Sequence, residues 1–245
     1  MGLEVAGLVE IDQLWYTWSP VGLSKTAGWQ VRAASTGLRN LHSHRYLALE
    51  RHLGYSLPEG VSPVRIHPDD APLCLALVGC GQERALLQKR FIGTLPERGP
   101  GIYFVHALVG LPESFSPKAA VSLWRSTFWR SSVDGLADYD LCLPAVTMEE
   151  LGLFARPADL TGNPVVREHL PFVIEAFLQL TPEQRLYLAA PPDTVALLVQ
   201  SLASSLPPEM LASVTFTTYE RDVRQCSAKV VGTCWQGGDG RGATG

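Results

Sequence analysis

The feature that most constrains the fold is a series of short apolar runs rich in β-branched and aromatic side chains. The clearest is residues 102–109, IYFVHALV, and residues 8–19 and 29–35 have a similar composition. Such runs are typical of β-strands. The segment between the last two contains Gly22 and Gly28, which favour a loop. We therefore expect residues 8–35 to form an antiparallel hairpin with a long connection.

Two more apolar runs, residues 73–79 and 84–92, are separated by only four residues. We interpret them as two strands joined by a short turn. A strand followed by a helix is the alternative, because Leu and Gln are good helix formers. Helices are predicted over residues 44–53 and 116–130, the second with Ser116 as its N-cap.

The second half of the chain alternates between helical and strand patterns. Helices are expected over residues 165–180 and 193–205, with a short one over 207–212. Strands are expected over 185–190, 213–219 and 227–235. This alternation favours an α/β unit in which neighbouring strands are parallel.

These patterns predict an α/β (α+β) protein with an N-terminal antiparallel-rich sheet, flanking helices and a smaller helix-strand-helix-strand unit. The expected domains are residues 1–135 and 165–235. Residues 136–164, which are punctuated by Asp, Gly and Pro, are expected to be a linker. The Gly-rich residues 236–245 are expected to be a flexible tail.

Composition argues against two classes of partner. The 245 residues carry a formal net charge of −4, and no run of clustered Lys and Arg is present. Nucleic-acid binding, which needs such clusters to neutralise phosphates, is therefore not expected. No stretch of 18 apolar residues suggests a membrane span. The first twelve residues also lack the basic start of a signal peptide, so a cytoplasmic protein is expected.

Catalytic motifs are largely missing from the sequence. It contains neither a GxxxxGK[ST] phosphate loop nor a GxGxxG fingerprint, so no nucleotide cofactor is expected. The pair His42 and His44 has the spacing of a zinc pair on a strand but no obvious third ligand, and a solvated loop is the better interpretation. An alternative enzyme hypothesis is a hydrolase or protease-like protein that uses Cys80 or Cys74 with His106. A core histidine satisfied by a hydrogen bond is preferred for His106.

An unusual aromatic segment lies near the N-terminus. Within residues 13–35 the chain carries Trp15, Tyr16, Trp18, Trp29 and Arg32. Trp, Tyr and Arg dominate the binding hot spots of protein interfaces, so these five residues form our predicted partner-binding surface. The alternative is that the same hairpin forms part of the core.

This segment resembles the N-terminal domain of a bacterial GTPase-associated protein family found with GTPases in conflict (anti-phage) operons. The matching stretches are residues 13–19 (QLWYTWS), 22–23 (GL), 28–35 (GWQVRAAS) and 37–38 (GL). The second half resembles the middle domain of that family, through residues 186–191 (LYLAAP), 206–208 (LPP) and 215–219 (TFTTY).

The resemblance implies a specific role. It suggests a non-enzymatic adaptor or regulatory protein that contacts a GTPase, or another NTP-dependent component, of an antiviral defence system. It brings no catalytic residues with it. The partner would be a protein, and no metal or cofactor is implied.

Overall fold

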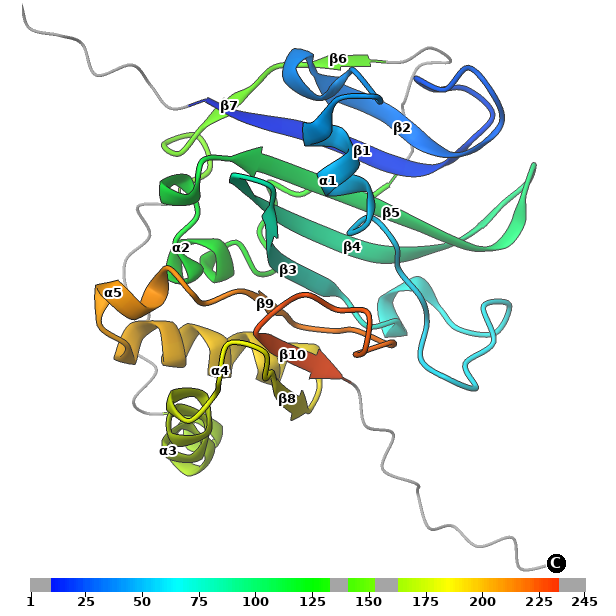
Figure 1. Ribbon diagram of the computed structural model, residues 1–245. Coiled ribbons are helices and arrows are strands. Elements are labelled where there is room, and N and C mark those ends of the chain that lie inside the picture. The colour runs from blue at the N-terminus through cyan, green and yellow to red at the C-terminus, as the bar shows by residue number, and fades with distance from the viewer. Residues whose placement is uncertain (1–9, 133–140, 153–162, 234–245) are drawn as a thin grey trace, which may run out of the picture.

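One mixed sheet organises the chain in a computed structural model, which describes residues 10–132, 141–152 and 163–233 (Figure 1). Within these residues the strands follow the order β6-β2-β1-β5-β4-β3-β9-β10-β8, and β7 pairs separately with β1. Their bounds are β1 (Glu10–Ser19), β2 (Gly28–Ser35), β3 (Cys74–Cys80), β4 (Glu83–Leu95), β5 (Gly99–Gly110), β6 (Leu141–Leu143), β7 (Val146–Thr147), β8 (Leu186–Ala189), β9 (Phe216–Thr217) and β10 (Val230–Thr233). The mixed α/β class predicted from the sequence is confirmed.

The N-terminal strands are antiparallel, as the sequence predicted. β1 pairs with β2 in a hairpin, and β3 pairs with β4 across a tight turn. The interpretation of residues 84–92 as a strand is therefore confirmed, and the helical alternative is wrong. β5 then lies between β4 and β1, which closes a continuous antiparallel sheet.

The C-terminal strands extend this same sheet. β9 pairs antiparallel with β3, and β10 runs parallel to both β9 and β8. The expected parallel unit is therefore present. It forms one sheet with the N-terminal strands, which the sequence left open.

Five α-helices accompany the described strands: α1 (His44–Glu50), α2 (Pro117–Ser122), α3 (Pro164–Leu178), α4 (Pro192–Ser205) and α5 (Pro208–Leu211). Short 3-10 turns occur at η1 (Thr36–Leu38), η2 (Pro68–Asp70) and η3 (Pro112–Ser114). Ser43, Ser116 and Asn163 begin their helices as N-caps, each accepting a backbone N–H with its side chain. Pro171 lies inside α3 without ending it.

The helix predicted over residues 116–130 is wrong in length, because α2 ends at Ser122. Arg125 adopts a left-handed backbone conformation with φ of 56°. Its guanidinium makes two bonds to the carboxylate of Asp193, of 2.7 and 2.8 Å. The indole of Trp124 donates to the same carboxylate. These contacts with α4 are long-range in sequence, so local helical spacing did not predict them.

The stretch 136–164 differs from a simple linker. Its residues Leu141–Leu143 form β6, which pairs parallel with β2, and Val146–Thr147 form β7 on β1. The Gln13 side chain also donates to the Pro144 carbonyl at 2.8 Å. Residues 133–140 and 153–162 lie outside the described residues, as does the predicted tail.

Strand alternation gives the sheet two different faces. On one face, α2, α3 and α4 cover a core that includes Leu75, Leu77 and Leu86. On the other, α1 and η1 cover a core that includes Leu14, Val105 and Ala107. Figure 1 shows α1 crossing its face far from α3 and α4. No helix in the described residues is long and apolar enough to cross a membrane.

Gly232 of β10 lies very close to the backbone of Thr218, which follows β9. We therefore predict that no larger residue fits at position 232 without a shift of the backbone. A Cβ there would overlap the carbonyl oxygen of Thr218. We expect Gly232→Ala to lower the free energy of unfolding by about 1–3 kcal/mol, because backbone must move to make room. Urea unfolding measures this. Gly79→Ala is the matched control, since its Cβ would meet nothing within 4 Å. Equal stability of the two variants would contradict the packing described here.

Candidate functional site

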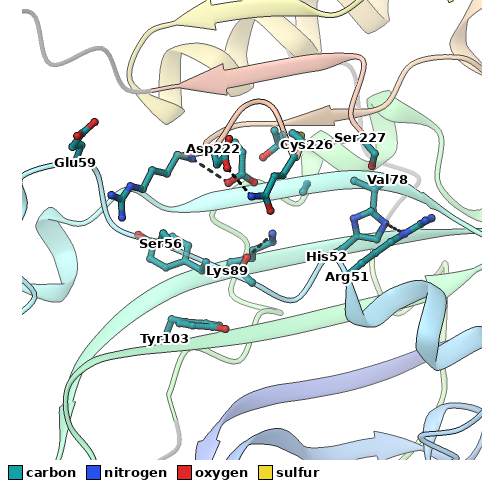
Figure 2. Close-up of a pocket in the computed structure, with 17 residues that line it drawn as sticks. Arg51, His52, Ser56, Glu59, Val78, Lys89, Tyr103, Asp222, Cys226 and Ser227 are labelled. Atoms are coloured by element: carbon teal, nitrogen blue, oxygen red, sulfur yellow. Dashed lines mark hydrogen bonds between the residues drawn. The ribbon is translucent and has the colours of Figure 1, made fainter. Parts of the chain in front are cut away.

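A cleft of about 680 Å³ lies on the face of the sheet that carries α1 (Figure 2). Its floor comes from β3, β4, β5 and β9. One wall is the segment after α1, residues 51–59, and the other is the loop 220–227 between β9 and β10. The size lies within the range of small-molecule sites. The cleft therefore draws on both halves of the chain.

Lys89 is the deepest charged residue of the cleft, with only 6% of its surface exposed. It lies on β4 and shares a face with Ala85 and Leu87, because alternate residues of a strand point the same way. Its ammonium donates one hydrogen bond of 2.9 Å to the Gly54 carbonyl. Among the described residues its other N–H groups have no acceptor.

Two tyrosine hydroxyls and the ammonium of Lys89 hold the wall after α1 against the rest of the cleft. The hydroxyl of Tyr219 donates to the Ser56 carbonyl at 3.0 Å, and that of Tyr55 donates to the Pro72 carbonyl at 2.7 Å. With the bond from Lys89 to Gly54, these contacts hold residues 54–56 in place. A segment without regular secondary structure is thus a formed wall of the cleft.

Two acidic residues of the cleft, Glu220 and Asp222, accept hydrogen bonds from within their own loop. Glu220 accepts from the backbone N–H of Arg221 at 3.1 Å, and burial raises its pKa while Lys89 opposes that rise. Asp222 accepts from the Arg224 backbone and the Gln225 side chain. These bonds shape the loop, so the carboxylates serve mainly to build the wall.

His52 lies at the rim beside Arg51, which donates a hydrogen bond to its Nε2 at 3.1 Å. Burial, together with the nearby cations Arg51 and Lys89, lowers the pKa of His52 to about 4. The imidazole is therefore neutral at pH 7. It presents a polar but uncharged surface to the cleft.

Two of the aromatic residues predicted from the sequence lie beside the cleft. Trp29 stacks on Tyr103, with ring centroids 4.0 Å apart and planes 19° from parallel. Tyr16 stacks more loosely on Trp29, at 6.2 Å. Since Tyr103 lies on β5 and lines the cleft, Trp29 supports the floor of the cleft through this stack. Trp18 is paired with Trp29 in the strand register and is half-buried.

The predicted surface is not a single face. Trp15 lies on the opposite side of the sheet, where it meets His106 edge-on at 6.0 Å and Arg130 at 5.4 Å from its ring centroid. Arg32 is 5% exposed and donates to the Val21 carbonyl at 2.6 Å. It occupies an extra position in β2, where the register with β1 shifts. A bulge of this kind cannot be read from simple alternation.

The proposed thiol–imidazole pair is wrong. Cys74 and Cys80 belong to the core on the α1 face, whereas His106 packs between Trp15 and Trp129 on the other face. Burial raises the pKa of each thiol to about 11. His106 accepts from the Arg130 backbone and bonds the Gln13 side chain at 3.1 Å. The interpretation of His106 as a satisfied core residue is confirmed.

The zinc hypothesis also finds no support in the geometry. His42 lies in an exposed turn and His44 begins α1, so the two rings do not share a strand. Among the residues that the structure describes, no cluster of three His, Cys, Asp or Glu side chains could hold a metal.

Sequence reasoning missed the cleft because its residues come from three distant segments. Lys89 belongs to none of the sequence motifs considered above. The available signal was its place in the apolar run 84–92, two positions after Leu87 on the same side of a strand. A lysine at such a position points toward the interior and therefore requires an explanation.

Burial of neutral His106 predicts a specific dependence of stability on pH. Its pKa is lowered to about 3, against about 6.5 in the unfolded chain. Between these values the unfolded chain binds a proton that the folded chain excludes, so stability falls as pH falls. We expect the wild type to lose up to about 1.4 kcal/mol per pH unit more than His106→Gln between pH 6.5 and 5.

Urea unfolding at each pH measures this difference. The exposed His42→Gln variant is the control and should keep the wild-type slope. A slope for His106→Gln equal to that of His42→Gln would show that folding does not lower the pKa of His106.

Comparison with known proteins gives two matches to family models and nothing further. Residues 10–149 match GTPase-associated protein 1, N-terminal domain type 2. Residues 158–244 match GTPase-associated protein 1, middle domain. No curated protein and no solved structure matches the chain. The first match covers more than half of the sequence, so the chain belongs to the GTPase-associated protein 1 family.

Proposed function

We propose that this chain is a non-enzymatic adaptor or regulatory protein that binds a GTPase in a bacterial conflict (anti-phage) system. The observation that carries the proposal is the match of both halves to GTPase-associated domains. The separation of Cys74 and Cys80 from His106 by the sheet removes the catalytic pair that the rival hypothesis required.

The proposed contact surface is the outer part of the β1–β2 hairpin. Trp18 and Trp29 are half-buried there, and the connecting loop at residues 20–27 is largely exposed. Arg32 has a supporting role, because its guanidinium holds the carbonyl of Val21 in that loop. Trp15 faces the other side of the sheet and is left out of this surface.

Half-exposed tryptophans suit this role physically. An indole supplies a large contact area with few rotatable bonds, so little conformational entropy is lost on binding. Trp29 is already held by its stack on Tyr103, and Trp18 lies beside it in the register. The hairpin therefore offers preorganised aromatic area next to a polar loop.

We expect the tagged chain to recover a GTPase from its native host, with recovery that differs between a GTP analogue and GDP. Mass spectrometry identifies the bound protein. Trp18→Ala should reduce recovery by about tenfold or more, as truncation of an interface anchor does. Tyr187→Ala is the matched control, because Tyr187 is an exposed aromatic residue on β8 at the other edge of the sheet.

Recovery of no GTPase in either nucleotide state would contradict the adaptor role. Equal losses for Trp18→Ala and Tyr187→Ala would leave the adaptor role standing and reject the hairpin as its contact surface.

A further inference from the structure

Lys89 places a positive charge at the floor of the cleft, where the Gly54 carbonyl is its one hydrogen-bond acceptor among the described residues. Only 6% of the surface of Lys89 is exposed, and the residue lines the floor of the cleft. An ammonium has three N–H donors, and Lys89 uses one, to Gly54. Burying a charge is costly unless it is paired, so the remaining donors suggest a missing acceptor.

Charge alone does not decide which ligand would supply that acceptor. The cleft carries the cations Arg51, Lys89 and Arg221 and the acids Glu59, Glu220 and Asp222. Burial and hydrogen bonding distinguish the two sets. Glu220 and Asp222 accept bonds within their own loop, whereas Lys89 has unused donors at the floor. An anionic oxygen group at the bottom of the cleft would therefore accept hydrogen bonds from the unused N–H groups of Lys89.

The surroundings indicate that the anion is part of a larger molecule with a ring. A free phosphate would fill only a small part of a cleft of about 680 Å³. Tyr55 and Tyr103 line the same cleft with centroids 5.9 Å apart, and Trp29 stacks on Tyr103. Aromatic side chains of this kind stack on planar bases. The guanidiniums of Arg51 and Arg221 at the rim suit phosphate oxygens.

We propose that the cleft binds a nucleotide, with a phosphate on the ammonium of Lys89 and the base against Tyr55 and Tyr103. Both family segments would contact this ligand, since the floor comes from β3 to β5 and one wall from residues 220–227. The site adjoins the proposed hairpin surface through the stack of Trp29 on Tyr103, but it does not depend on the identity of a protein partner.

Isothermal titration of the full chain tests the proposal with the four nucleoside 5′-monophosphates. Adenosine and guanosine without phosphate, inorganic phosphate and glutarate are the comparison ligands. We expect at least one nucleotide to bind more tightly than all of these. Lys89→Met should weaken that binding by about tenfold or more, as expected for loss of a charge-assisted hydrogen bond. Lys25→Met, on an exposed loop lysine, should leave it unchanged.

The same variants separate binding from folding. If Lys89 serves the ligand, Lys89→Met should unfold in urea at a midpoint no lower than the wild type, because a buried charge has been removed. If Lys89→Met does not fold, Arg221→Gln on the exposed wall becomes the decisive variant. It should weaken nucleotide binding at least threefold. The proposal is overturned if no nucleotide binds below about 1 mM. It is also overturned if nucleosides or glutarate bind as tightly, or if the decisive variant binds like the wild type.

Discussion

The pairing of β3 with β9 is the contact on which the rest of the structure depends. It matches Ala76 with Thr217 and Leu77 with Phe216, and so joins strands that are about 140 positions apart in the chain. Thr218 strengthens the junction, since its N–H donates to the Leu75 carbonyl and its hydroxyl accepts from the Leu75 N–H, both at 2.9 Å. Because Thr218 is fully buried, water cannot replace these bonds. Because the loop 220–227 follows β9, this junction places the loop beside the cleft.

The two faces of the central strands perform different tasks. On the face under α2 and α4 the core is mainly apolar. Buried polar residues on this face are hydrogen-bonded: Arg84 donates to the Phe115 carbonyl, and both ring nitrogens of His106 are bonded. On the α1 face the core is next to the cleft: Tyr103 packs against this core and lines the cleft together with Lys89. The helical face therefore contributes stability. The other face combines a smaller core with a polar site.

Alternation in the sequence predicted the strands of the first half and the parallel unit of the second, because those patterns reflect local burial. The predicted helix at 116–130 ends early, at Ser122, and beyond it Arg125 has a left-handed backbone conformation and bonds Asp193 of α4. Trp15 and Tyr16 are neighbours in sequence and so point to opposite faces, which divides the predicted aromatic surface. The cleft could not be predicted, since its three segments meet only once β9 lies beside β3.

The shared construction of the cleft affects how the two family segments can vary. The first segment supplies β3, β4 and β5 of the floor and the wall at residues 51–59, and the second supplies β9 and the opposing loop. Tyr219 of the second segment is bonded to Ser56 of the first. A middle segment taken from another member would therefore bring a loop shaped for a different floor. We therefore expect the residues of the two segments that face the cleft to vary together among family members. The segments are not freely interchangeable modules.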